Sequence, residues 1–364
     1  VFESEWFRRP VTLAEIERLK NLSEDSDWRR FAVLAWSHAD LAPVRALLER
    51  NGVPVRRAIP SGLPWLGHIR EFKSLLDHLQ SNQRQDIHIP ELRGNLAATC
   101  KVGPGGSIWM AMADRMLKGL EAEIGDDPVP ATEVFEAIHQ GLADHHRSHI
   151  IGDGILVSTI HAAKGLEFDH VLVLGSLRKA RNAADPFAEE ERRLYYVAMT
   201  RARHTLALID SHNSPNPYFA EIRHSTLNRR VAVAGNQSVP LVSLKYEALG
   251  PRDLNMDFAG RKPASHPIHR SLASLQAEDA VDLHPLPDGG VQVRDGRHVE
   301  VARLSRAGAA RFPHSRLALV DEARVLGMMS RHLDKTGPDY RSKMKVETWE
   351  LPLLELRLRQ SPTS

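Results

Sequence analysis

An α/β pattern that stops and then resumes is the feature that most restricts the fold of this chain. Phe31-Ala-Val-Leu-Ala35 is a continuous apolar run of strand length, and the sequence predicts a helix after it over about Leu41–Asn51. Similar segments return only later: strands at Ile155–Ile160, His170–Leu174 and Thr205–Asp210, and a helix over about Ala188–Arg203. Fully apolar strands are typical of parallel sheets that are covered on both faces. The sequence therefore predicts one parallel-sheet domain interrupted by an insertion.

The segments around this domain have other periodicities. A helix is predicted over residues 12–22, and three more fill the insertion at Ile69–Gln80, Ile108–Ile124 and Thr132–His146. Beyond Ser211, short alternating runs between Gly/Asp turns are typical of a small β-rich module, such as a compact β-barrel or an SH3-like fold. We expect four regions: 1–59 and 151–215 as the two parts of the α/β domain, 60–150 as the helical insertion, and 216–364 as an accessory β-rich domain.

Composition excludes several classes of protein. The 364 residues contain no apolar run long enough to span a membrane and no secretory leader, so neither a membrane protein nor a secreted one is expected. The single cysteine, Cys100, forms no internal disulfide, which favours a cytoplasmic location. A net charge of +2 is too balanced to indicate nucleic-acid binding. Because the chain begins with Val1, we expect it to be a piece of a longer polypeptide.

The segment Val157-Ser-Thr-Ile-His-Ala-Ala-Lys-Gly-Leu-Glu-Phe168 concentrates side chains that can do chemistry. It predicts a strand that runs into a tight turn presenting His161, Lys164 and Glu167, with Gly165 allowing a close backbone approach. Ligands of α/β proteins bind at loops after the carboxyl ends of parallel strands. We therefore expect a ligand at this turn.

A second segment, Glu189–Arg203, predicts a helix whose acidic start suits a helix N-terminus. Leu194, Val197 and Arg201 repeat at helical spacing, which puts Arg201 on the stripe expected to face the sheet. An arginine on a buried stripe needs an anion. Taken alone, Arg201 favours a salt bridge with a carboxylate at the core edge; the functional alternative is a phosphate.

These two segments resemble motifs V and VI of superfamily 1 DNA helicases of the UvrD/Rep/PcrA type, and Phe31–Asn51 resembles their motif IV. The resemblance covers roughly residues 25–215 and places the helical insertion where this family carries its 2B subdomain. In the family, two RecA-like domains of the P-loop NTPase fold clamp ATP between them and step along single-stranded DNA. The resemblance implies that this chain supplies the second of those domains.

The resemblance also implies a role for particular residues. Arg201 resembles the arginine finger that touches the γ-phosphate of ATP, Glu167 resembles the acid that binds the ribose, and Gly165 belongs to the same nucleotide-binding turn. The residues that resemble DNA contacts are Thr159, His161 and Lys164. The implied cofactor is ATP with Mg²⁺, shared with a P-loop-bearing RecA-like domain in the same or another chain. The implied substrate is single-stranded or forked DNA, in repair or recombination.

Two departures from the family pattern limit what this chain can do alone. Trp36 stands after the first strand, where the family has a phosphate-sensing arginine, and an indole cannot stabilise an anion in that way. No G-x-x-x-x-G-K-[ST] pattern occurs, because Gly103-Pro-Gly-Gly106 is followed by Ser107 and Ile108. We do not expect the chain alone to hydrolyse ATP, and its status as an enzyme stays open.

Two patterns that imitate functional sites favour a structural role. Leu317-Ala-Leu-Val-Asp-Glu322 resembles a Walker B strand, but no P-loop precedes it. His145 and His149 have a spacing that could grip zinc, but they lack a third ligand, so a solvated helix face is the better interpretation and no metal site is predicted.

Two further patterns near the end of the chain favour ordinary surface and core. The basic residues Arg341, Lys343 and Lys345 fit a solvated strand edge better than a DNA patch. Trp349 and the run Leu351–Leu356 are predicted to be core.

Three hypotheses about function remain. The first is the C-terminal portion of an ATP-dependent DNA helicase. The second is a catalytically inactive helicase-like module that binds DNA or a protein partner, which the absent P-loop and Trp36 favour. In the third, the β-rich region is the functional part and the helicase-like region is its scaffold.

Overall fold

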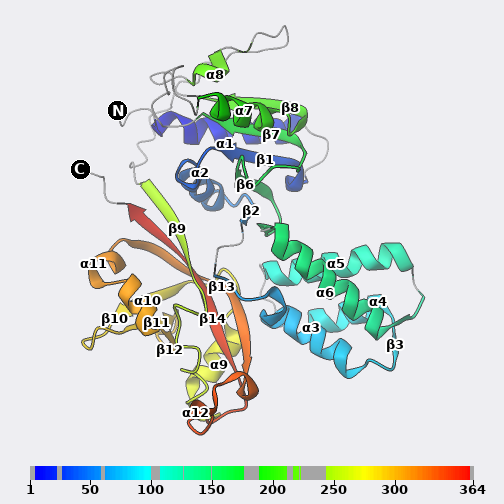
Figure 1. Cartoon of the computed structure of the whole chain (residues 1–364), viewed down its shortest axis with the longest axis vertical. Helices are drawn as coiled ribbons and strands as arrows, with labels where there is room; N and C mark the ends of the chain where they lie inside the picture. Colours follow the sequence, from blue (N-terminus) through cyan, green and yellow to red (C-terminus); the bar gives the residue numbers. More distant parts are fainter. Residues whose placement is uncertain are drawn as a thin grey trace. The chain divides into compact units, whose positions relative to one another are not determined.

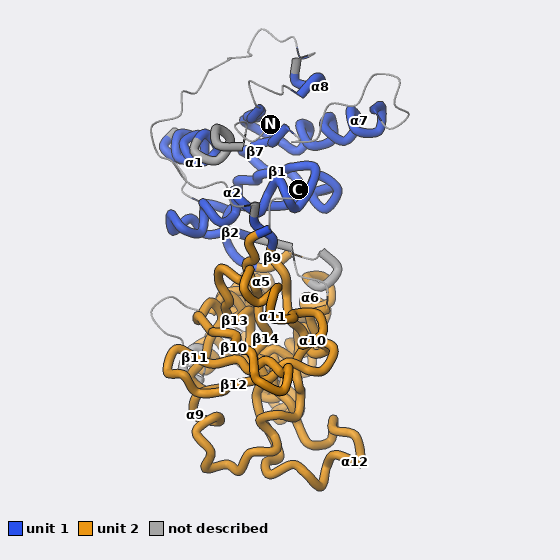
Figure 2. The backbone as a smooth tube through the Cα atoms, turned by 90° about the vertical axis from the view of Figure 1, so that its left-hand side faces the viewer, with its two compact units in different colours: residues 1–58, 152–245, 360–364 blue, residues 59–151, 246–359 orange. Residues whose placement is uncertain are grey.

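The computed structural model describes residues 5–22, 27–58, 62–99, 107–125, 127–148, 150–175, 188–210, 216–220, 222 and 243–360. They divide into two compact units (Figure 2): unit 1 contains residues 1–58, 152–245 and 360–364, and unit 2 contains residues 59–151 and 246–359. Among the described helices, none has both the length and the apolar character that crossing a bilayer requires.

Unit 1 contains a parallel sheet of five strands (Figure 1). The strands are β1 (Phe31–Ala35), β2 (Val55–Ala58), β6 (Ile155–Thr159), β7 (Phe168–Leu174) and β8 (Ala202–Ile209). They lie in the order β2-β6-β1-β7-β8, and each neighbouring pair is parallel. The central strand β1 is buried along its whole length, as its apolar run predicts. The mixed α/β class and the parallel sheet are therefore confirmed.

Unit 1 also contains helices, which precede or follow these strands along the chain. They are α1 (Glu5–Leu22), the short 3-10 helix η1 (Trp28–Arg30), α2 (His38–Arg50), α7 (Ala188–Met199) and α8 (Pro217–Ala220). Helix α2 begins after Ser37, whose Oγ accepts a hydrogen bond from the Asp40 backbone N–H at 3.3 Å. One apolar core, which includes Ile16, Phe31 and Leu172, holds α1 and α2 to the sheet.

The prediction of a helix as far as Arg203 is wrong in its last turn. Helix α7 ends at Met199, Thr200 and Arg201 form a turn, and β8 already begins at Ala202. The Phe168 backbone N–H donates to the Arg201 carbonyl at 2.9 Å, so pairing with β7 captures the residues that helical periodicity had assigned to α7. Tertiary pairing thus outweighs local helix propensity here.

Unit 2 combines the predicted helical insertion with the C-terminal strands. The elements of its first segment are the 3-10 helix η2 (Leu66–His68), α3 (Arg70–Ser81), α4 (Ile89–Thr99), α5 (Ile108–Ile124), α6 (Ala131–Ser148) and the short strands β3 (Asp86–Ile87), β4 (Val129–Pro130) and β5 (Ile150–Ile151). The three predicted helices are present. Helix α4 was not predicted, because Pro90 and Gly94 weaken its local helix signal, although Ile89 and Leu92 are buried.

The second segment of unit 2 is rich in strands. Its strands are β9 (Ser243–Leu249), β10 (Val281–Pro285), β11 (Val291–Asp295), β12 (Glu300–Arg303), β13 (Val320–His332) and β14 (Thr348–Gln360). Its helices are α9 (Pro267–Ser274), α10 (Arg306–Arg311), α11 (His314–Leu317), the 3-10 helix η3 (Leu333–Lys335) and α12 (Pro338–Arg341). The strands form two three-stranded sheets, β10-β11-β12 and β13-β14-β9.

One hydrophobic core joins both segments of unit 2. Trp109 of α5 is fully buried, and its indole Nε1–H donates to the Leu326 carbonyl of β13 at 2.8 Å. A Cβ at Gly327 would lie 2.6 Å from that indole nitrogen, so the close approach requires glycine. Trp349, Leu351 and Leu353 belong to the same core, which confirms their predicted burial.

Candidate functional site

The turn after β6 begins at the carboxyl edge of the unit 1 sheet. Thr159 is level with Ala35 at the ends of β6 and β1. Its Oγ1 accepts a hydrogen bond from the Ala162 N–H at 3.4 Å, and its carbonyl accepts one from the Ala163 N–H at 3.1 Å. Thr159 therefore holds the shape of the turn that presents His161.

His161 and Trp36 form an aromatic pair at this carboxyl edge. Their ring centroids lie 5.9 Å apart with an interplanar angle of 74°, an edge-to-face arrangement. His161 and Lys164 are exposed, and Trp36 is half-buried. The position that departs from the family pattern thus lies beside a predicted DNA contact. Sequence reasoning treated Trp36 only as a lost phosphate sensor and missed this pair.

Residues 160–167 carry the chain from the carboxyl edge of β6 to the amino edge of β7 without a helix. Lys164 and Gly165 lie on this segment. Gly165 has a φ of +86°, and a Cβ added there would meet nothing within 4 Å. Glycine is therefore favoured at this position by its left-handed backbone and not by a close neighbour within the described residues.

Arg201 lies at the opposite, amino edge of the sheet. Its Nε donates to the Val197 carbonyl at 3.0 Å, its Nη1 to the Leu166 carbonyl at 3.3 Å, and its Nη2 to Thr200 Oγ1 at 3.1 Å. The side chain is half-buried, and no carboxylate of the described residues forms an ion pair with it. The salt bridge that a lone arginine favours is thus absent from the described part of the chain.

Glu167 lies at the same edge. Its Oε2 accepts a hydrogen bond from Arg203 Nε at 3.0 Å, and both side chains are at least half exposed. The pairing of Phe168 with Ala202 brings the two residues together. Sequence reasoning missed Arg203 because it expected a helix there, whereas Arg203 belongs to β8 and pairs with Glu167.

A third set of charged residues surrounds the start of β7. Asp169 forms ion pairs with Arg30 and, at 3.3 Å, with His204 Nδ1. Burial opposes ionisation of Asp169, but the Arg30 guanidinium, together with His204 and His170, outweighs burial and holds the pKa of the carboxyl below its ordinary value. Burial lowers the pKa of the neighbouring His170, whose Nδ1 lies 2.8 Å from Thr205 Oγ1. No sequence signal singled out this cluster.

The six predicted site residues therefore fall into two groups. Thr159 and His161 lie at the carboxyl edge, Glu167 and Arg201 lie at the amino edge, and Lys164 and Gly165 lie between them on the connecting segment. The register of β1 with β7 puts the two edges about 20 Å apart along the strands. The expectation of one ligand-binding edge is thus corrected, because a short crossover takes the second half of the motif to the other end of the sheet.

The weaker motifs do not form additional sites in the described residues. Asp321 and Glu322 begin β13 and pair with Arg357, so the segment that resembles a Walker B strand does not end in its acidic pair. Burial lowers the pKa of His145, which is half-buried and not on a fully solvated face; His149, Cys100 and Gly103–Gly106 lie outside the described residues. The described ranges contain no group of three or more His, Cys, Asp or Glu side chains that could hold a metal ion.

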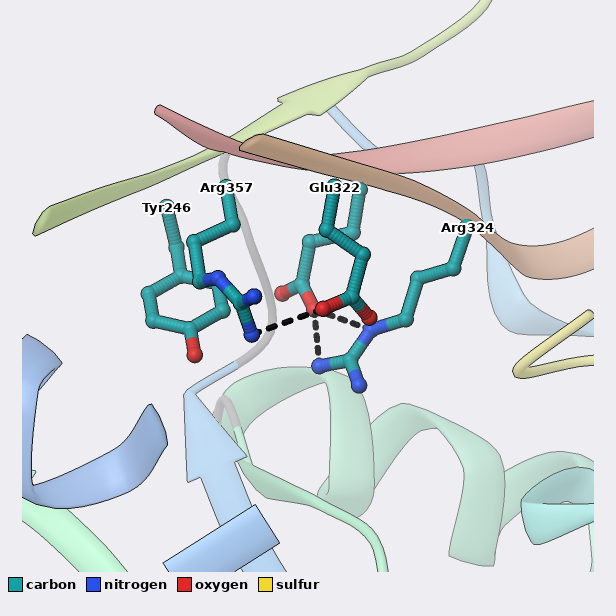
Figure 3. Close-up of a pocket in the computed structure, with 5 residues that line it drawn as sticks. Tyr246, Glu322, Arg324 and Arg357 are labelled. Carbon is teal, nitrogen blue, oxygen red and sulfur yellow. Dashed lines mark hydrogen bonds and ion pairs between the residues drawn. The ribbon is translucent and has the colours of Figure 1, made fainter. Parts of the chain in front are cut away.

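A pocket in unit 2 is lined by charged side chains that satisfy one another (Figure 3). Arg324 donates from Nε and Nη2 to Glu355 Oε2 at 3.0 and 2.7 Å, and Arg357 pairs with Glu322 at 2.7 Å. Tyr246 completes the lining. Glu355 is only 2% exposed, so its pairing compensates the cost of burying its charge. We interpret this cluster as structural.

Comparison with known proteins places the two motifs in a family. Residues 126–213 match the UvrD-like helicase C-terminal domain. An alignment of 111 positions with a putative ATP-dependent DNA helicase, YjcD, of Bacillus subtilis has 49% identity and covers 25% of this chain and 15% of that protein. The chain is also 39% identical to DNA helicase II of Rickettsia typhi and 33% identical to ATP-dependent DNA helicase PcrA of Staphylococcus aureus. Each of these two matches covers 21% of this chain and 13% of the relative.

These matches confirm the resemblance to UvrD-like helicases. The family match, over residues 126–213, contains both chemistry-bearing motifs. The matched region spans 15% or less of each of these relatives, so it represents a small portion of a helicase.

Proposed function

We propose that this chain is the C-terminal portion of an ATP-dependent DNA helicase. In this proposal unit 1 is the second RecA-like domain of a pair that drives movement along single-stranded or forked DNA, in repair or recombination. A P-loop-bearing RecA-like domain, in the same or another chain, supplies the site for Mg²⁺ and the β,γ-phosphates of ATP. Residues 60–150 take the place of the 2B subdomain, and residues 216–364 form an accessory region.

The environment of Arg201 carries the proposal. Its guanidinium is half-buried yet bonded only to carbonyl and hydroxyl oxygens among the described residues. Hydrogen bonds between a guanidinium and a charged phosphate are roughly twice as strong as those to neutral acceptors. A γ-phosphate presented at the amino edge can therefore replace the neutral acceptors, which a carboxylate partner would have prevented. This residue fits the arginine finger that stabilises charge on the transferring phosphoryl group.

Glu167 suits a ribose contact at the same edge. Its exposed ion pair with Arg203 is worth at most about 1 kcal/mol, because solvent screens both charges. The carboxylate can therefore exchange this pair for a ribose hydroxyl at little cost. Gly165 completes the nucleotide group by letting the connecting segment turn with a positive φ just before Glu167.

The carboxyl edge and the connecting segment that follows it supply the DNA contacts in this proposal. Lys164 and His161 are exposed, so a backbone phosphate can approach the ammonium of Lys164 as a point charge. Trp36 and His161 offer aromatic surface for a base beside it. Thr159 supports the turn through its acceptor atoms and retains its hydroxyl proton for a phosphate oxygen.

The test is ATP turnover by the longer protein that contains this chain and the P-loop domain. Arg201→Ala is expected to reduce DNA-stimulated turnover about 10³-fold or more, since arginine fingers contribute about 10³–10⁵. Arg192→Ala, which removes an exposed arginine from α7, is the matched control and is expected to leave turnover within about twofold. Unchanged turnover in Arg201→Ala would refute the assigned role.

A second candidate is an inactive helicase-like module that grips DNA or a protein partner. Trp36 in place of the phosphate-sensing arginine favours it. The same preparation separates the two candidates. Binding of single-stranded DNA without DNA-stimulated turnover by the wild-type protein would establish the module, whereas turnover that depends on Arg201 would exclude it.

A further inference from the structure

Unit 2 carries a basic and aromatic surface that no motif of the helicase family explains. We call it the Tyr340 patch and define it as Arg261, Lys262, Tyr340, Lys343 and Lys345. Tyr340 is 47% exposed. Arg261 Cζ lies 5.9 Å and Lys343 Nζ 5.3 Å from the centroid of its ring. The sequence predicted that Arg341, Lys343 and Lys345 lie on a solvated strand edge. Arg341 instead lies on α12, and Lys343 and Lys345 lie on the loop that precedes β14.

The backbone beneath the patch is fixed from two sides. The Lys345 N–H donates to the Gly260 carbonyl at 2.8 Å, which joins the loop after α12 to the segment that carries Arg261. Below them, the buried Trp349 donates from Nε1 to the Met256 carbonyl at 2.7 Å. Arg341 donates to the carbonyls of Thr336 and Asp334 and so closes the turn that presents Tyr340. These hydrogen bonds therefore hold the backbone of the patch in place.

The cations of the patch differ from other cations of unit 2 that lie over aromatic rings. Arg303, Arg311, Arg316 and Arg331 all lie near a ring, and each also pairs with a carboxylate. In the described part of the chain, Arg261, Lys262, Lys343 and Lys345 form no such pair. Asp339, beside Tyr340, and Glu347 are the nearest acids in sequence on α12 and its following loop. Positive charge therefore prevails across the patch.

We propose that the Tyr340 patch binds a single strand of nucleic acid, with one base stacked on Tyr340 and neighbouring phosphates on Arg261, Lys343 and Lys345. The inference rests on the proposed function for the class of ligand and adds a second contact surface, in unit 2. A stacked base contributes more to binding than a cation held over an exposed ring. A base can therefore displace the cation from the ring face, and the freed cation then pairs with a phosphate.

The experiment is titration of the whole chain against fluorescein-labelled oligo(dT) at several salt concentrations. Tyr340→Ala is expected to weaken binding about tenfold and Tyr340→Phe less than about twofold, because phenylalanine keeps the stacking face. Lys343→Glu is expected to weaken binding about fivefold and to reduce the slope of log K against log salt by about 0.7 or more. Arg297→Glu, an equal charge reversal at an exposed arginine of unit 2, is the matched control and is expected to change affinity less than twofold.

The outcomes separate this inference from the proposed function. If Tyr340→Ala and Lys343→Glu bind like the wild type while Lys164→Glu binds weakly, the patch is refuted and the helicase assignment stands. If no variant differs because the chain does not bind the strand, both fail. An abasic strand should bind wild type and Tyr340→Ala equally; a persisting tenfold difference would refute base stacking. Sedimentation with anionic vesicles that depends on Lys343, without competition by oligo(dT), would show a membrane surface as the ligand and overturn the proposal.

Discussion

The two edges of the unit 1 sheet use the same kinds of side chain in opposite ways. At the amino edge, charged residues meet partners: Arg30 pairs with Asp169, and Arg203 pairs with Glu167. At the carboxyl edge, His161 is exposed and its ring packs against that of Trp36, and Lys164 is exposed on the segment that follows. Paired charges satisfy each other, whereas an exposed cation with no carboxylate partner among the described residues is available to a ligand. The difference teaches that one motif can supply both an edge of paired charges and an exposed surface without such pairs.

The largest expected loss of stability follows a substitution in β1, the strand that runs between the two edges. Phe31 is fully buried in β1, with its ring 4.5 Å from His170 and 5.8 Å from Trp28. Phe31→Ala should lower the free energy of unfolding of unit 1 by about 3–5 kcal/mol, because it leaves a cavity in the core. Urea unfolding followed by circular dichroism measures this. Phe31→Leu, which keeps most of the side-chain volume, should lower the free energy of unfolding much less. Equal losses of unfolding free energy in the two variants would show that the two edges are not held by one core.

The next effect concerns the amino edge and its dependence on pH. Arg30→Ala should cost about 1–2 kcal/mol near neutral pH, at the low end for a charged hydrogen bond because Arg30 is 34% exposed. The pKa of Asp169 is lowered, so its stabilising contribution is complete above the ordinary aspartate pKa and disappears as the pH falls through the folded value. The pKa of His170 is also lowered, so stability falls as the pH drops below the ordinary histidine pKa.

Both groups thus make unit 1 less stable in acid. Thermal unfolding between neutral and acidic pH measures the loss. The variant Arg30→Ala should lose less of its stability on acidification than the wild type, since Asp169 no longer has its main partner. A parallel shift of the two curves would contradict the assigned role of the pair.

The smallest expected effect is on DNA affinity, and it tests the difference between the two regions directly. Lys164→Glu on the connecting segment should weaken affinity for single-stranded DNA about fivefold, roughly 1 kcal/mol, with no change in unfolding. Arg203→Glu reverses the same charge at the amino edge and should leave DNA affinity within about twofold. Fluorescence anisotropy at low salt measures both. Equal weakening by the two variants would mean that the edges do not differ in function.

The sequence predicted most of the sheet and only part of the site. Runs such as Phe31–Ala35 are fully buried strands, so their apolar pattern was sufficient. The predicted end of α7 was wrong because the pairing of Arg201 and Ala202 with β7 depends on residues more than thirty positions away. The placement of Glu167 and His161 at opposite edges could not be predicted, because local periodicity does not show that residues 160–167 cross the sheet without a helix. Tyr340 was missed because one of the two cations over its ring, Arg261, comes from a segment almost eighty residues earlier.

The way unit 2 is assembled from two stretches of chain has a consequence for biosynthesis. Trp109 is made early, but its hydrogen-bond acceptor, Leu326, and the strand β14 that completes the core leave the ribosome only after the whole second part of unit 1. At about 5–20 residues per second, the apolar faces of α3, α5 and α6 wait some 10–40 s for the strands that cover them. The apolar faces of these helices therefore stay without their strand partners until translation reaches β14.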